Sequence, residues 1–218
     1  MTISIYRYII YFVYTGCSRR NSRSRRPEMY IDFLGLAGIT AGIAYVLIIR
    51  DVLKGTSPMN IATWLIWSIV NTVVTASIIA SGFTHPWMNL IFTAGAIVVF
   101  LLSLRRGRWK WGKTESVCFL IALSAMGGWY FLGPTPAIVL SVSAMCIGGI
   151  PQLRDTFNQP RSQQMRNWML FLISCIFSLV GAPMWDLAHA LYPVAGGVLN
   201  GLMCLFIMRK PRSGRLYR

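Results

Sequence analysis

The amino-acid sequence predicts an all-α integral membrane protein with seven transmembrane helices, and three observations support that fold class. Apolar residues make up 55% of the 218 positions and charged residues only 12%, a balance that does not suit a water-soluble domain. The apolar residues gather in runs of about 20, the length that an α-helix needs to cross a bilayer. Lysine and arginine lie between these runs and at the chain ends, which argues against a nucleic-acid-binding surface.

The expected helices follow one another with short connections. Each apolar run is bounded by charged residues, proline or glycine, which end or interrupt membrane helices. Little of the chain is therefore left for a soluble domain. The runs cover roughly residues 30–49, 61–82, 86–104, 116–133, 135–153, 167–183 and 187–208.

The distribution of basic residues predicts the orientation in the membrane. Of the 21 lysines and arginines, six precede the first run, and the other fifteen follow the first, third, fifth and seventh runs. With seven spans these fifteen lie on one side, and cytoplasmic loops are where such residues collect. We therefore expect a protein of the cell (inner) membrane, with its N-terminus outside and a basic cytoplasmic tail over residues 211–218.

Residues 1–28 conflict with this orientation, because their six arginines would lie outside. Residues 3–16 include an apolar run that is short for a span and is interrupted by Arg7. This run could be a signal-like segment, an interfacial anchor or an eighth helix. We favour translation that starts at Met29, so that residues 1–28 are an extension that is absent from the cell or disordered.

Sliding the sequence on itself by 104 residues indicates an internal repeat. The shift brings Arg50, Asp51, Trp64 and His85 into register with Arg154, Asp155, Trp168 and His189. These landmarks fall at equivalent places in two helix triplets. Because one helix separates the triplets, both have the same orientation, which makes the repeat parallel (3+1+3). Transporters built from such repeats hold their substrate near the bilayer midplane between the halves.

The repeat predicts how the chain divides. We expect an N-terminal extension, a first triple-helix repeat, a linker with the fourth helix, a second triple-helix repeat and a basic tail. Their boundaries are 1–28, 29–106, 107–133, 134–210 and 211–218.

The fifth run ends in Gly148, Gly149, Ile150, Pro151, Gln152, Leu153 and Arg154. This segment resembles the proline–glutamine motif of the PQ-loop family, which includes SWEET and SemiSWEET sugar transporters, cystinosin-like amino-acid transporters and the KDEL receptors. The spacing of Pro193, Gly197 and Gly201 resembles the seventh helix of SWEET proteins. The resemblance covers about residues 30–210 and implies transport by alternating access.

The resemblance also assigns a gating role to Pro151 and Gln152, since prolines loosen helices by removing a backbone hydrogen bond. The first triplet carries Leu47 and Ile48 at the equivalent places, so we expect the two halves to flex unequally. Where SWEETs place a sugar-binding asparagine after the proline of the seventh helix, this chain has Val194.

Polar and aromatic residues on three spans are candidates for solute binding. Trp64, Ser68 and Asn71 follow a three-and-four spacing and so form one stripe along a helix. The corresponding face of the sixth run carries Trp168, Phe171, Cys175 and Ser178. Indole rings suit the CH faces of a sugar, and an amide can both donate to and accept from its hydroxyls. Asn200 of the seventh run is a further candidate, and hydrogen bonding between helices is the alternative role.

Charged and titratable residues at the span ends suggest gates. Adjacent acidic and basic residues end the first and fifth runs and could form ion pairs between the halves, or could simply set the topology. A second cluster, of two histidines and one aspartate, could make a pH-sensitive gate. Alternatively, the histidines are interfacial and the aspartate caps a helix. The first set is Arg50, Asp51, Arg154 and Asp155, and the second is His85, Asp186 and His189.

These observations together predict a transporter that moves a small polar solute without tight ion coupling, because none of the six acidic residues falls at the midplane of a run. We expect a sugar ahead of an amino acid, and a receptor or sorting protein of the same fold is the rival. No catalytic motif, metal-ligand spacing or cofactor motif is apparent, so we expect no enzyme activity. The expected partners are the solute, the bilayer and a second copy in a homo-oligomer, with no nucleic acid.

Overall fold

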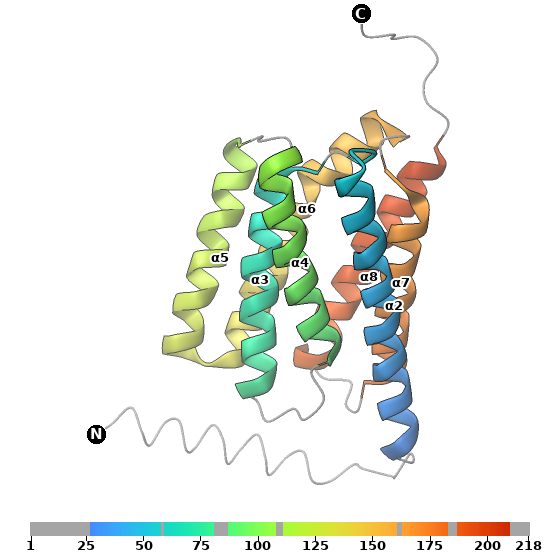
Figure 1. Ribbon diagram of the computed structural model, residues 1–218. Coiled ribbons are helices and arrows are strands. Elements are labelled where there is room, and N and C mark those ends of the chain that lie inside the picture. The colour runs from blue at the N-terminus through green and yellow to red at the C-terminus, as the bar shows by residue number, and fades with distance from the viewer. Residues whose placement is uncertain are drawn as a thin grey trace, which may run out of the picture.

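The computed structural model describes residues 27–57, 59–80, 87–107, 111–160, 163–182 and 187–209. Within these residues the chain is all-helical (Figure 1). The helices are α2 (Pro27–Leu53), α3 (Ile61–Ala80), α4 (Trp87–Arg106), α5 (Lys113–Leu132), α6 (Pro134–Asn158), α7 (Met165–Val180) and α8 (Leu187–Met208). Each of the seven expected helices is therefore present.

Five of these helices, α2, α3, α4, α6 and α8, are long and apolar enough to cross a membrane. The apolar helix α7 is shorter, with 16 residues. At about 1.5 Å per residue it is roughly 24 Å long, less than the about 30 Å of a hydrocarbon core. The five apolar helices indicate a membrane-spanning protein, whereas seven crossings stay a prediction.

The helices pack as a closed ring with one helix outside it. Following the contacts around the ring gives the order α2, α4, α3, α6, α8 and α7, and α7 packs against α2 again. Helix α5 packs on the outside of the ring, against α6 and α3. Figure 1 shows α5 at one flank of the bundle and α2 with α7 at the opposite flank.

Successive helices run in opposite directions, so the connections alternate between the two ends of the bundle (Figure 1). Helices α2, α4, α6 and α8 finish at the end where α3, α5 and α7 begin. We call this the basic end, because the described lysines and arginines lie there, namely Arg50, Lys54, Arg105, Arg106, Lys113, Arg154, Arg166 and Arg209.

Small residues let α2 approach its neighbours closely. Ala37, Ala41 and Ala44 follow a three-and-four spacing and are fully buried. Gly95 of α4 faces Tyr45, because a Cβ at this glycine would lie 2.3 Å from the tyrosine ring. The tyrosine ring thus fills the space that a side chain of α4 would occupy, and it is directed toward the centre of the bundle.

Candidate functional site

A cavity of about 50 Å³ lies inside the ring, and all six ring helices contribute to its wall. The wall is rich in aromatic rings and amide side chains. The lining residues are Tyr45, Trp64, Trp67, Asn71, Phe92, Met145, Gly149, Gln152, Leu153, Trp168, Phe171, Cys175, Tyr192, Gly196, Leu199, Asn200 and Met203.

Five of the six residues that the sequence suggests for solute binding line this cavity. They come from three helices, and all are at least nine-tenths buried. Ser68 is buried but does not line the cavity, and its Oγ donates to the Trp64 carbonyl oxygen at 2.7 Å, within α3. The five lining residues are Trp64, Asn71, Trp168, Cys175 and Asn200.

Some polar atoms of the wall have hydrogen-bond partners within the protein and others do not. The Tyr192 hydroxyl donates to Asn71 Oδ1, which joins α8 to α3. Asn200 Nδ2 donates to the Gly196 carbonyl oxygen at 2.7 Å, one turn back along α8. In the part of the chain that the structure describes, buried Trp64 Nε1 has no hydrogen-bond partner. This indole N–H is a donor that a polar solute could satisfy.

Of the other aromatic residues of the wall, sequence reasoning selected Phe171 but not Tyr45, Trp67, Phe92 or Tyr192. Tyr45 donates its hydroxyl to the Phe92 carbonyl oxygen at 3.1 Å, and its ring centroid lies 4.8 Å from that of Phe171. Trp67 stacks edge-on against Trp64, with ring centroids 5.1 Å apart. The 104-residue shift pairs Trp67 with Phe171, so that register offered a signal for Trp67. Tyr45 and Phe92 have no aromatic counterpart in that register.

The cavity is too small for a solute of the size of a sugar. A cavity needs at least about 10–15 Å³ to hold one water, so this one has room for a few waters. Pockets that hold drug-sized ligands measure roughly 300–1,000 Å³. A sugar therefore does not fit unless the helices move apart.

Pro151 and Gln152 lie in α6, which continues through the proline to Asn158. Gln152 is 2% exposed and lines the cavity on the side of the basic end. Pro151 lies one residue before it and cannot donate a hydrogen bond to the carbonyl of Ile147. The proline thus weakens the helix directly beside the cavity.

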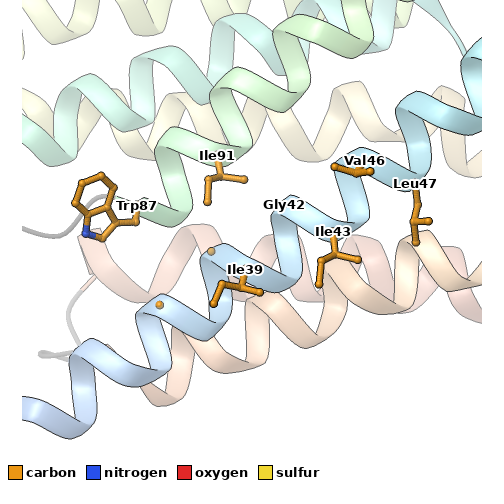
Figure 2. A pocket seen from close by; sticks show the side chains of 9 residues that line it. Ile39, Gly42, Ile43, Val46, Leu47, Trp87 and Ile91 are labelled. Atoms are coloured by element: carbon orange, nitrogen blue, oxygen red, sulfur yellow. The ribbon is translucent and has the colours of Figure 1, made fainter.

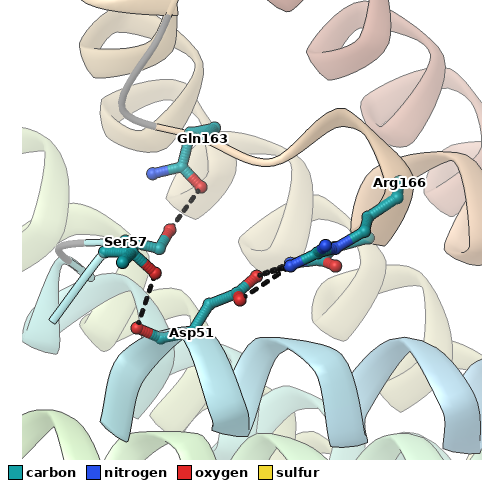
Figure 3. A network of polar contacts seen from close by, with 6 residues as sticks. Asp51, Ser57, Gln163 and Arg166 are labelled. Atoms are coloured by element: carbon teal, nitrogen blue, oxygen red, sulfur yellow. Dashed lines mark hydrogen bonds and ion pairs between the residues drawn. The ribbon is translucent and has the colours of Figure 1, made fainter. Parts of the chain in front are cut away.

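A polar cluster connects α2 to the start of α7 at the basic end (Figure 3). Arg166 Nη2 donates to Asp51 Oδ1 at 2.8 Å and to Oδ2 at 3.2 Å, and Asn167 Nδ2 donates to Oδ2 at 2.9 Å. The Asp51 side chain is 3% exposed and that of Arg166 46% exposed. In the adjoining segments, Ser57 Oγ donates to Gln163 Oε1 at 3.3 Å.

The four charged residues suggested as gates differ from one another in their burial and in their contacts. Asp51 does form an ion pair between α2 and α7, but with Arg166, which sequence reasoning did not select. Arg50 and Arg154 are exposed, and Asp155 is half-buried. Arg166 begins a helix after a polar loop, so no periodic pattern predicted that it would reach α2.

The suggested pH-sensitive cluster lies outside the described residues. His85 and Asp186 fall in the undescribed stretches 81–86 and 183–186. His189 belongs to α8, but its side chain is also outside the description. The proposed contact among these three residues stays a prediction.

A second hollow is an open groove between α2 and α4 on the outer face of the ring (Figure 2). Figure 2 shows Trp87 at one end of it and Val46 and Leu47 toward the other. Its wall is apolar, which suits lipid chains rather than a polar solute. The residues that line it are Gly35, Gly38, Ile39, Gly42, Ile43, Val46, Leu47, Trp87 and Ile91.

Comparison with family models, with curated proteins and with solved structures finds no match for this chain. The function has therefore to be inferred from the residues of the chain itself, above all from those around the central cavity.

Proposed function

We propose that the protein is a membrane transporter that moves a small uncharged polar solute, with a sugar ahead of an amino acid, by alternating access. The observation that carries the proposal is a closed central cavity whose wall combines aromatic rings with amide side chains and is contributed by six helices. Such a cavity can hold a solute midway across a bilayer once the helices around it move apart.

The chemistry of the wall favours an uncharged solute. None of the described residues that line the cavity is an aspartate, glutamate, lysine or arginine. A zwitterionic amino acid would lose its hydration without gaining a counter-charge, which is costly in a low-dielectric interior. The hydroxyls of a sugar are satisfied by amides such as Asn71 and Asn200, while its CH faces stack on indole rings.

The contacts around the ring support two equivalent halves, α2–α4 and α6–α8, joined through α5. Exchanging α2 with α6, α3 with α7 and α4 with α8 converts each contact of the ring into another contact of the ring. The pair α2–α7, for example, becomes α6–α3, and both pairs are packed. This pattern is expected of a 3+1+3 parallel repeat whose halves face each other across the cavity.

The place of the proline–glutamine pair supports membership of the PQ-loop family. Pro151 lies inside α6 next to the cavity, and Gln152 contributes to the cavity wall. A helix weakened at this position can bend and so open the wall. The basic end is then the cytoplasmic side, since basic residues collect there, and the protein belongs to the inner membrane.

Uptake into proteoliposomes tests the function. The purified protein is reconstituted and supplied with labelled mono- and disaccharides and neutral amino acids, alongside Asn71→Ala and Trp64→Ala. Ser68→Ala is the matched control, because this hydroxyl is bonded within α3 and does not line the cavity. Saturable sugar uptake that survives in the control and is lost in the other two supports the proposal.

The remaining outcomes separate the parts of the proposal. Sugar uptake that both cavity variants leave intact would keep the transporter and remove the proposed site. Uptake of amino acids alone would reverse the preference for an uncharged solute. Folded protein that moves none of these solutes would favour a receptor or sorting protein.

A further inference from the structure

The interface between α2 and α7 is held by polar contacts that join the two halves. At the basic end the buried Asp51 carboxylate accepts from Arg166 and Asn167. Farther along, Ser174 Oγ donates to the Ala37 carbonyl oxygen at 2.7 Å, and both residues are fully buried. Separating α2 from α7 would leave a carboxylate and a backbone carbonyl without these donors in an apolar interior.

The same interface stays tight at the opposite end. The rings of Phe33 and Phe177 lie 6.1 Å apart between centroids. A Cβ at Gly181 would lie 2.9 Å from Phe33 Cβ and 3.1 Å from the Leu34 backbone nitrogen, so a side chain fits there only if the ends of α2 and α7 move slightly apart. Contacts therefore join α2 to α7 and its C-terminal glycine along their whole length.

The interface between α3 and α6 has the equivalent place in the other half of the ring but lacks equivalent contacts. In the 104-residue register Arg166, Asn167 and Ser174 correspond to Ala62, Thr63 and Val70. Neither alanine nor valine can donate a hydrogen bond from its side chain.

Ser141 occupies the position that corresponds to Ala37. In the described part of the chain its Oγ is buried and has no hydrogen-bond partner. The hydrogen bond that joins α3 to α6 runs from Trp67 Nε1 to the Met145 carbonyl oxygen at 3.3 Å.

Helix α6 also has features that favour movement. It contains Pro151, whereas α2 has Leu47 in the same register and no internal proline. Its residues at the contact with α3 include Gly148, where a Cβ would lie 3.1 Å from Ile66 Cγ2. Helix α5 packs against both α3 and α6, and only Gly133 separates it from α6. A moving α6 would therefore carry α5 with it.

We infer that the two interfaces have different roles, with α2–α7 as a fixed hinge and α3–α6 as the place where the cavity opens toward the basic end. This inference rests on the proposed alternating access. Opening at α3–α6 breaks the neutral hydrogen bond from Trp67 to Met145. Opening at α2–α7 would break the ion pair between the buried Asp51 carboxylate and half-exposed Arg166, and also the buried hydrogen bond from Ser174 to Ala37. Asp51, Arg166 and Ser174 are thus positioning residues that keep the hinge closed.

Disulfides across each interface test the inference. Ile66→Cys with Gly148→Cys crosslinks α3 to α6, since a Cβ at 148 would lie 3.8 Å from Ile66 Cβ, close to the mean of about 3.8 Å in disulfides. Phe33→Cys with Gly181→Cys crosslinks the hinge, once the end of α7 has moved by about 0.6–0.9 Å to bring the 2.9 Å Cβ–Cβ distance to the about 3.5–3.8 Å of disulfides. Cys17, Cys118, Cys146 and Cys204 are replaced by alanine in both variants.

The native Cys175 then reports opening, because it lines the cavity and is 1% exposed in the closed conformation. A membrane-impermeant maleimide is added to the basic side of oriented vesicles, and mass spectrometry gives the labelling rate of Cys175. We expect the α3–α6 disulfide to slow labelling about tenfold or more and the hinge disulfide to change it by less than about twofold. The reduced form of each variant is its own control for folding and should label at the rate of the parent.

Three results would overturn the inference. Both disulfides could slow the labelling of Cys175 equally, the hinge disulfide alone could slow it, or the reduced parent could show no labelling at all. Solute flux is measured on the same samples. The expected labelling pattern without flux would support the hinge and defeat the transport proposal, so the two failures are distinguishable.

Discussion

At the scale of single residues, Asp51 carries a buried charge and therefore depends on its hydrogen-bond partners. Its carboxylate is nearly inaccessible to water and accepts hydrogen bonds from Arg166 and Asn167. Hydrogen bonds to charged groups contribute about 1.5–3 kcal/mol, and the half-exposed Arg166 places this pair toward the lower end. We expect Asp51→Asn to lower the free energy of unfolding by about 1–2 kcal/mol, measured by denaturant titration in detergent.

Asp155 supplies the matched control for that prediction. It occupies the same register in the other half, and its side chain is only half-buried. Because its carboxylate is more exposed than that of Asp51, Asp155→Asn should lower the free energy of unfolding by less than Asp51→Asn does. A larger loss from Asp155→Asn than from Asp51→Asn would contradict the assignment of Asp51 to the hinge.

Residue types and spacing were enough to find much of the cavity wall. Trp64 and Asn71 were predictable because polar and aromatic residues at helical spacing face inward in an apolar bundle. Ser68 shares their stripe, but serine hydroxyls readily bond the carbonyl one turn back, as this one does. The Asp51–Arg166 pair could not be predicted, because it joins residues 115 positions apart and one of them follows a loop.

At the scale of helices, the contact between α2 and α4 depends on Gly95. A Cβ there would lie 2.3 Å from the Tyr45 ring, and the ring is held by the hydrogen bond from its hydroxyl to Phe92. Overpacking a core costs about 1–3 kcal/mol. We expect Gly95→Ala to lose that amount of stability, measured by thermal unfolding in detergent.

Gly42 of α2 is the comparison for Gly95, since a Cβ built there meets nothing within 4 Å. Gly42→Ala should be neutral or slightly stabilising, because alanine is a better helix former than glycine by roughly 0.5–1 kcal/mol. Similar effects of the two substitutions would show that α2 and α4 do not pack as described.

Pro151 provides a second prediction at this scale. Pro151→Ala restores a backbone donor inside α6, so we expect higher thermal stability but a solute uptake rate several-fold lower, with the half-saturating concentration unchanged. Pro193→Ala is the control, because this proline lies in α8 toward the end opposite the basic end. Uptake by Pro151→Ala at the parent rate would mean that bending of α6 does not limit opening.

The bounds of the helices were only partly predictable. Apolar runs placed the middle of each helix correctly, but α2 continues to Leu53 and α6 to Asn158, several residues beyond the runs. A helix need not end where hydrophobicity ends, because charged residues continue it at the water interface. Arg50 and Asp51 lie in the last helical turns of α2 for that reason.

At the scale of the whole molecule, the order of helices around the ring was not predictable from hydropathy. The sides of a membrane helix that face lipid and those that face other helices are both largely apolar. Hydropathy therefore gives little indication of which helices are neighbours. The 104-residue register predicts that equivalent helices have equivalent surroundings, and the 3+1+3 repeat stays a prediction. The inequality of the two interfaces depends on individual pairs such as Ser174 with Ala37, which only the structure shows.

The charge distribution leads to the last prediction, the orientation of the whole bundle. Lys54 is exposed at the basic end, and Asp32 is exposed near the start of α2 at the other end. In a background with the five native cysteines replaced by alanine, we expect Lys54→Cys to react with an impermeant maleimide only in inside-out vesicles, and Asp32→Cys only in intact cells. Reaction of both variants from one side would mean that α2, the helix that lies between them, does not cross the membrane as proposed. The reverse pattern would place the fifteen basic residues outside, against the strongest topological rule for membrane helices, and would then make the arginines of residues 1–28 the cytoplasmic signal.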